Sequence, residues 1–110
     1  MGNRNKVHLV ACPFEQAMDV LSGKWKGMLV FRLKEQSLRF SEIQTMLPGI
    51  SNRMLARIVK ELELEEMLLK VSNSTEQYAR YKLSEIALQL LPGLQLIRDW
   101  GLLYQKELKN

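Results

Sequence analysis

Apolar residues recur at intervals of three and four positions over residues 14–21, 24–36, 51–66 and 85–108. This spacing places them on one side of a helix and predicts four amphipathic helices. The second helix has the broadest apolar face, so we expect it to be largely buried. Pro92 interrupts the fourth and predicts a kink or a restart there.

A further short helix is predicted before residue 51. Ser41, followed three positions later by Gln44, has the pattern of a capping box, so we expect the helix to begin at Ser41. The Pro-Gly pair at residues 48–49 ends this helix near Leu47. Ser51 then serves as the N-cap of the next helix.

Three segments are expected to be extended, namely residues 38–40, 68–72 and 78–83. The last two are separated by the polar residues 73–77, which predicts a β-hairpin with a polar tip. Two helices joined by a tight turn and followed by a hairpin form a winged helix-turn-helix, whose second helix enters the major groove of DNA. The expected fold is therefore α+β and mostly α.

A length of 110 residues with 46% hydrophobic residues fits one globular domain over residues 1–110. Residues 41–66 would form its helix-turn-helix and residues 68–83 its wing. The flanking helices, residues 14–21 and 85–108, carry more apolar surface than this unit can cover, so we expect them to form a homodimer. The dimer would hold two recognition helices about 34 Å apart on a pseudo-palindromic site. The residues expected at the interface are Leu9, Phe14, Leu94, Ile97, Trp100, Tyr104 and Leu108.

The charges along residues 51–66 run against the helix macrodipole. Arg53, Arg57 and Lys60 lie in the first part and four glutamates crowd the end, although a helix favours acids first and bases last. A polyanion at the leading end is the simplest explanation, because backbone N–H groups and basic side chains attract the same phosphates. The net charge of +4 agrees with an acidic partner.

The polar side of this helix offers side chains suited to reading double-stranded operator DNA. Asn52, Arg53 and Arg57 are expected to meet base edges, and Lys60 is expected to meet a phosphate. The alternative is a solvated face on which Arg57 pairs with Glu61, an arrangement worth only about 0.2–0.5 kcal/mol. The other residues expected at the DNA, chiefly at phosphates, are Lys24, Lys26, Arg39, Ser41, Ser51, Lys70 and Arg80.

Seven short motifs follow one another along the chain: Cys12-Pro13, Gly23-Lys24-Trp25, Arg39-Phe40-Ser41-Glu42-Ile43, Leu47-Pro48-Gly49-Ile50-Ser51 with Arg53-Met54-Leu55, Leu62-Glu63, Tyr81-Lys82-Leu83-Ser84 and Trp100-Gly101. In this order they resemble the HxlR-type winged-helix transcriptional regulators, relatives of the MarR group, over roughly residues 12–101. The resemblance implies a dimeric bacterial DNA-binding regulator in the cytoplasm. Two departures leave open whether the wing enters the minor groove. The wing tip carries Glu76 and lacks proline, and residues 84–87 do not form the Thr-x-x-Gly common in the family.

Cys12 is the only cysteine and His8 the only histidine. This excludes an intramolecular disulfide and a multi-cysteine zinc site, so we expect no metal and no cofactor, and it fits a reducing cytoplasm. No apolar run approaches the roughly 20 residues of a membrane span. Cys12 lies at a helix N-terminus near Lys6, where it could sense oxidants or electrophiles. The resemblance adds that some family members sense through the matching cysteine. The alternative is a small buried hydrophobe under the first helix.

The residues thus predict a homodimeric transcriptional regulator that is not an enzyme, and they leave open a response to thiol-reactive, redox or small-molecule signals. Two other hypotheses remain. A winged-helix module could bind protein without DNA, which the acidic residues 61–66 favour, and sequence preference with a log-salt slope would separate it from the regulator. A cysteine-based enzyme lacks an evident general base, and thiol alkylation rates against pH would test it.

Overall fold

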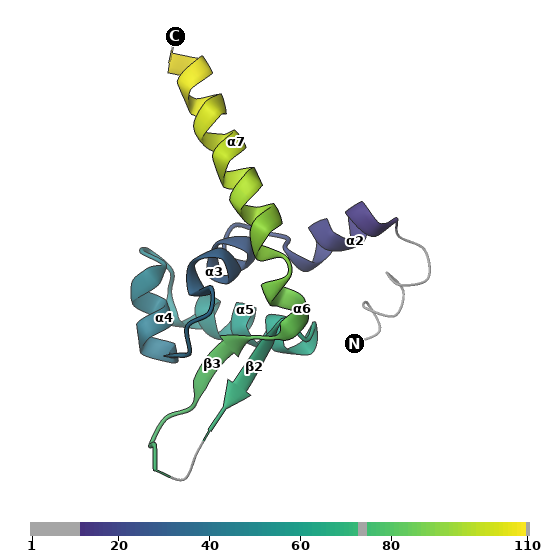
Figure 1. Ribbon diagram of the computed structural model, residues 1–110. Coiled ribbons are helices and arrows are strands. Elements are labelled where there is room, and N and C mark those ends of the chain that lie inside the picture. The colour runs from purple at the N-terminus through teal and green to yellow at the C-terminus, as the bar shows by residue number, and fades with distance from the viewer. Residues whose placement is uncertain (1–11, 73–74, 110) are drawn as a thin grey trace.

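The computed structural model describes residues 12–72 and 75–109 and shows a helical body with a small sheet on one side (Figure 1). This confirms the expected α+β, mostly helical winged helix-turn-helix. The elements along the chain are α2 (Pro13–Val20), α3 (Lys26–Leu33), β1 (Leu38–Arg39), α4 (Phe40–Met46), α5 (Asn52–Leu64), β2 (Leu68–Val71), β3 (Arg80–Leu83), α6 (Glu85–Leu88) and α7 (Leu91–Lys109).

Strands β2 and β3 form the predicted antiparallel hairpin, and β1 pairs with the other edge of β3. Leu68 faces Leu83 across the hairpin, and Leu38 faces Tyr81 across the second pair. The hairpin projects from the body as the wing, and α7 projects on the opposite side (Figure 1). Among the described helices, none is long and apolar enough to cross a membrane.

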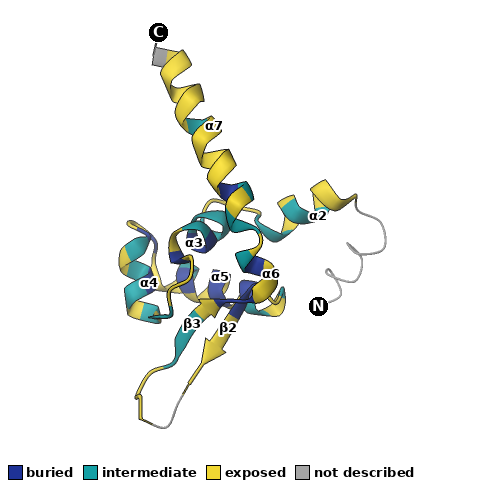
Figure 2. Cartoon of the chain, in the orientation of Figure 1, coloured by how far each residue is buried: buried dark blue, intermediate teal, exposed yellow. Residues whose placement is uncertain are grey.

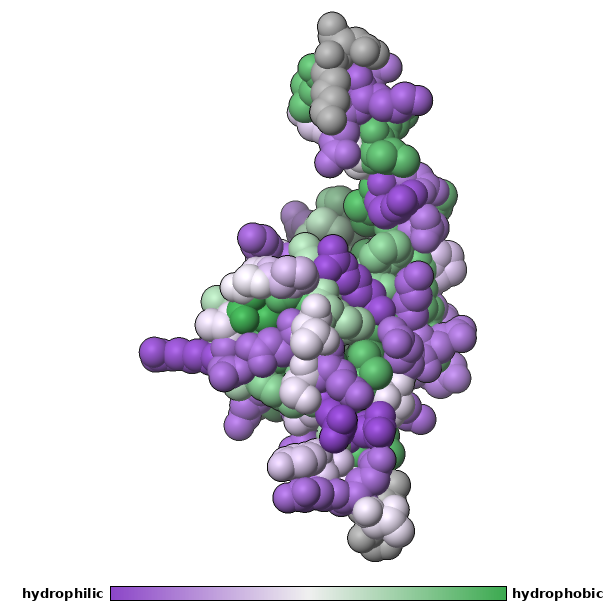
Figure 3. Space-filling view, turned by 90° about the vertical axis from the view of Figure 1, so that its left-hand side faces the viewer, coloured by the Kyte–Doolittle hydropathy of each residue, from purple (hydrophilic) through white to green (hydrophobic). Residues whose placement is uncertain are grey.

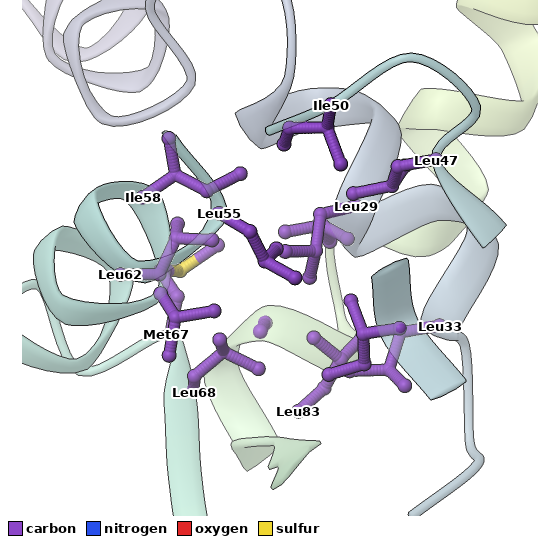
Figure 4. Packing of buried hydrophobic residues seen from close by; sticks show 14 of the residues in the cluster. Leu29, Leu33, Leu47, Ile50, Leu55, Ile58, Leu62, Met67, Leu68 and Leu83 are labelled. Carbon is purple, nitrogen blue, oxygen red and sulfur yellow. The ribbon is translucent and has the colours of Figure 1, made fainter. Parts of the chain in front are cut away.

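The apolar stripe of α5 forms one side of the core and faces the buried side chains of the other elements (Figure 4). Leu55, Ile58, Val59 and Leu62 are all buried, as their spacing predicts. The buried side chains of α3 belong to the same cluster, and α3 also contacts α4, β3 and α7. Figure 2 shows the buried positions gathered where these helices meet the start of the wing. The body thus holds α5 by one side only.

The N-cap of α4 is Arg39 and not Ser41, so the cap lies two residues earlier than predicted and the helix begins at Phe40. Arg39 is held extended because it pairs with Arg80 in the sheet, and the helical conformation starts directly after it. The backbone N–H of Arg39 donates to Oε1 of Glu42 at 2.8 Å. Ser41 therefore lies within the first turn of α4, where it is exposed.

Helix α5 begins as predicted and ends earlier. Ser51 Oγ accepts a hydrogen bond from the N–H of Met54 at 3.0 Å, which confirms Ser51 as the N-cap. Helix α5 ends at Leu64 because Glu66 adopts a left-handed φ of 63°. The hydroxyl of Ser84 donates to the carbonyl of Glu66 at 2.7 Å and so joins the end of α5 to the start of α6.

Two further boundaries follow from local conformation. Helix α3 is shorter than expected because Lys34 takes a φ of 56° and ends it. The fourth predicted helix is divided into α6 and α7, so Pro92 marks a restart, and its missing N–H is harmless in the first turn of α7.

Candidate nucleic-acid interface

The polar side of α5 is exposed along its first three turns. Asn52, Arg53, Arg57 and Lys60 are all exposed, whereas the opposite side of the helix is buried. Ser51 caps the end at which these residues begin, so the unpaired N–H groups of the first turn face the same region. The structure therefore brings together the residues predicted to meet base edges.

Glu61 joins this surface to the body of the protein. Its Oε1 lies 2.8 Å from Nζ of Lys26, and its Oε2 lies 2.9 Å from Nη1 of Arg57. The hydrogen bond from Lys26, followed by the charges of Lys26 and Arg57, holds the pKa of Glu61 below its ordinary value of 4.5. We call these three residues the Glu61 network. The pair between Arg57 and Glu61 that the sequence offered as an alternative is present.

The two lysines near the start of α3 differ. Lys24 is exposed and its Nζ lies 4.7 Å from the centre of the Trp25 ring. Lys26, also expected at a phosphate, is only 11% exposed in its side chain and pairs with Glu61. Lys24 is open to an approaching phosphate, whereas Lys26 is already engaged within the protein.

Arg39 and Ser41 are both exposed at the start of α4. The guanidinium of Arg39 lies 3.6 Å from Glu42. The backbone N–H of Arg39 is the main cause of a lowered pKa of Glu42, and the charges of Arg39 and Arg80 act in the same direction. This helix start therefore combines exposed polar groups with an ionised carboxylate.

The two predicted contacts on the wing have different surroundings. Lys70 is exposed, and its Nζ lies 6.0 Å from the centre of the Tyr81 ring. Arg80 donates from Nη1 to the carbonyl of Ser37 at 2.9 Å and from Nε to Glu76 at 3.0 Å. The carboxylate of Glu76 raises the pKa of Arg80. Arg80 thus braces the wing against the body, while Lys70 remains available.

Cys12 is exposed and is the N-cap of α2. Its Sγ accepts a hydrogen bond from the N–H of Glu15 at 3.4 Å, and its own N–H donates to Oε1 of Glu15 at 3.4 Å. The alternative of a buried hydrophobe is wrong for this residue, because the cap position holds the thiol at the end of the helix and not beneath it. Lys6 and His8 lie outside the described residues.

Helix α7 carries most of the residues expected at a dimer interface. Apolar side chains lie along the part that projects from the body (Figure 3). The rings of Trp100 and Tyr104 stack with their centroids 5.0 Å apart. Leu94 is instead buried in the protomer's own core, because the first turns of α7 pack on α3. Leu9 lies outside the described residues. The exposed members of the expected set are Phe14, Ile97, Trp100, Tyr104 and Leu108.

Residues 20–109 match the HxlR-like helix-turn-helix family. The chain belongs to this family. The match spans α3 to α7 and so includes α5, the two lysines near the start of α3 and the wing.

Relatives and solved structures agree with this assignment. The HTH-type transcriptional regulator YvaP of Bacillus subtilis is 42% identical over 92 residues, which cover 82% of this chain and 85% of YvaP. The redox regulator HypR in its reduced form is 29% identical, with a TM-score of 0.80 over 89% of this chain and 98% of HypR. The quinone-bound YodB from B. subtilis is 32% identical, with a TM-score of 0.70 over 82% of this chain and 97% of YodB. The HxlR-like protein is therefore a transcriptional regulator of the helix-turn-helix type and not an enzyme.

Two features of the HxlR-like chain escaped sequence reasoning. The contact of Lys26 with Glu61 joins residues far apart in the chain, and no local spacing marks it. Leu96 and Leu103 are exposed on α7 beside the expected interface residues, and their seven-residue separation could have identified them.

The lowered pKa of Glu61 predicts an acid dependence of stability. A carboxyl whose pKa is lower in the folded than in the unfolded state stabilises the fold above about pH 4.5, and this contribution is lost as the pH falls through the folded pKa. Between pH 7 and pH 3, the wild-type free energy of unfolding should fall by more than that of Glu61→Gln, with a difference of at most about 1 kcal/mol, the upper value for a solvent-screened ion pair. Urea denaturation measures both. Glu63→Gln is the control and should follow the wild type, and equal pH profiles for Glu61→Gln and the wild type would contradict the prediction.

Proposed function

We propose that this HxlR-like regulator acts in the cytoplasm as a homodimer that binds operator DNA with α5 in the major groove. The observation that carries the proposal is the exposed row of Asn52, Arg53 and Arg57 at the leading end of a helix whose other side is buried. An exposed helix of this kind fits the major groove, where each base pair presents a distinct pattern of donors and acceptors.

The exposed residues divide into those that read bases and those that position the protein. Asn52 would bind adenine through its paired donor and acceptor, and Arg53 and Arg57 would bind guanine. Phosphate contacts would fix the register without reading sequence. We assign these contacts to Ser51, Lys60, Lys24, Arg39, Ser41 and Lys70. Lys26 and Arg80 take positioning roles, because both are engaged in contacts within the protein.

The wing would lie along the sugar-phosphate backbone of the DNA. Its described residues near the tip include Glu76, which pairs with Arg80. A carboxylate beside the tip disfavours entry into the negatively charged minor groove. We therefore assign the wing to phosphate contact through Lys70 on β2.

A second copy of the chain would cover the apolar side of α7. Exposed apolar residues along a projecting helix mark a protein interface, because monomeric proteins rarely expose a continuous apolar surface of this extent. A two-fold axis along α7 would place the two copies of α5 on one side of the dimer, about one DNA turn apart. The site bound would then be pseudo-palindromic.

Cys12 would supply an effector response. The thiol is exposed at the N-cap of α2, where an oxidant or electrophile can reach it. HypR is named a redox regulator, and YodB has been solved with quinone bound. We propose that oxidants or electrophiles of this kind modify Cys12 and change the affinity for DNA through α2 and the dimer contacts.

Replacing Arg53 and Arg57 together by alanine should remove most of the sequence preference and leave only the part that Asn52 reads. Each lost base contact is worth about 1–3 kcal/mol, whereas phosphate attraction persists. The measurement is fluorescence anisotropy across a salt series, with a duplex selected from a random pool and a scrambled duplex of equal composition. Lys34→Ala with Arg98→Ala removes the same charge elsewhere and should keep the preference. Retention of the wild-type preference in the α5 variant would overturn the assigned readout, and a wild type without preference or salt slope would favour a protein-binding module.

Trp100→Ala combined with Tyr104→Ala should convert a dimer into a monomer, because it removes the stacked pair from the apolar side of α7. Sedimentation equilibrium gives the mass, and operator affinity should fall by at least tenfold as one half-site is lost (about 1.4 kcal/mol). Gln105→Ala, on the same helix, is the control. A double variant that sediments with the wild-type mass would refute the interface.

Treatment with a quinone should change the operator affinity of the wild type and leave that of Cys12→Ser unchanged. Serine keeps the N-cap, and Cys12 is the only thiol in the chain, so the comparison isolates one sulfur atom. Mass spectrometry would locate the adduct, and anisotropy would report the affinity. An equal response from both proteins, or none from either, would refute the sensor.

A further inference from the structure

The Glu61 network, composed of Lys26, Arg57 and Glu61, connects a largely buried cation, Lys26, with a solvent-exposed one, Arg57. The side chain of Lys26 is 11% exposed, that of Glu61 is 35% exposed and that of Arg57 is 59% exposed. One carboxylate oxygen of Glu61 lies 2.8 Å from Lys26, and the other lies 2.9 Å from Arg57. The carboxylate therefore ties a guanidinium on the exposed side of α5 to a lysine fixed in the body.

Two contacts along α5 hold the guanidinium of Arg57. Its Nη1 donates to Glu61, and its Nη2 lies 3.3 Å from the sulfur of Met54. A cavity of ≈ 240 Å³, lined in part by Lys24, Met54 and Glu61, lies beside it and leaves room for the side chain to move. A guanidinium has five N–H donors, and two of those of Arg57 are engaged in these contacts with described residues. Loss of the carboxylate would release the guanidinium of Arg57, and the cavity would give it room to move.

We propose that Glu61 is a specificity-determining residue, which holds Arg57 toward base edges and withholds its charge from neighbouring phosphates. This inference rests on the proposed function, in which α5 reads DNA. An unrestrained arginine beside a duplex can reach phosphates of any sequence, and such contacts raise affinity without raising preference. A carboxylate that neutralises part of this charge weakens binding to all sequences but preserves the contact that distinguishes one of them.

The geometry of the network suits this role. The carboxylate is shared between Lys26 and Arg57, and the hydrogen bond from Lys26 is the main reason that the pKa of Glu61 lies below 4.5. The group is therefore ionised at neutral pH, where DNA is bound. Lys26 keeps Glu61 in place, and its own side chain is too deeply buried to contact a phosphate. The network thus contains a positioning lysine, a shared acid and a single exposed cation.

The test is Glu61→Gln in the full-length chain, measured on the selected operator duplex and on the scrambled duplex over a range of salt concentrations. Release of Arg57 should steepen the slope of log K against log salt by about 0.9, the value for one further phosphate contact. The ratio of operator to scrambled affinity should fall roughly fivefold or more, the lower end for one bidentate base contact. Binding to the scrambled duplex should become tighter at low salt.

Three further variants identify the cause. Glu63→Gln removes one negative charge from the same helix without touching the network, and it should keep the wild-type ratio. Lys26→Met combined with Glu61→Gln removes both the lysine and the carboxylate that pairs with it. Any defect caused by an unpaired lysine should then disappear, and the ratio of operator to scrambled affinity should stay low. In an Arg57→Ala background, Glu61→Gln should no longer change the ratio, because the group that it positions is absent.

The outcomes separate this inference from the proposed function. If the wild type binds its operator selectively and Glu61→Gln behaves like Glu63→Gln, the role of Glu61 is refuted and DNA reading by α5 stands. If the effect of Glu61→Gln persists in the Arg57→Ala background, positioning through Arg57 is refuted. If the wild type shows neither preference nor a salt slope, the proposed function fails, and the inference fails with it.

Discussion

In α5, Leu55 and Leu62 are fully buried in one cluster with Leu29 and Leu33 of α3, and the rest of the structure depends on this cluster. Burying a leucine contributes roughly 1.5–3 kcal/mol, so the cluster fixes the rotation of α5 about its own axis. A helix buried along one side must expose the other. The same packing that stabilises the core therefore directs the polar residues of α5 into solvent.

The inverted charges of α5 acquire a structural explanation at one position. Placing Glu61 in the second half of a helix opposes the macrodipole, which costs about 0.3–1 kcal/mol for an exposed group. The contacts with Lys26 and Arg57 offset that cost, and they also link α5 to the start of α3. We infer that Glu65 and Glu66, beyond the end of the helix, would repel phosphates and so favour entry of the leading end into a groove.

Some details depended on partners far away in the chain. The spacing of Ser41 and Gln44 indicated a cap at Ser41, but Arg39 pairs with the wing strand and is the cap instead, two residues earlier. Arg80 looked like a phosphate contact because it is a cation on a strand, yet it donates to the carbonyl of Ser37, 43 positions away. Leu94 fitted the interface stripe of α7, yet the first turns of this helix complete the core.

The sequence by itself determined the elements, their order, the apolar side of α5 and the family. These properties follow from spacings of three and four, from N-caps and from turn residues, all of which act within a few positions. The tertiary structure decided which cations remain exposed, because that depends on contacts between distant segments. It assigned Lys26 and Arg80 to internal contacts, left Arg53 and Lys24 open to solvent, and placed Arg57 at the boundary between the two groups. The physical reason is that a charge pattern lists candidate groups, whereas packing decides which of them find a partner inside the protein.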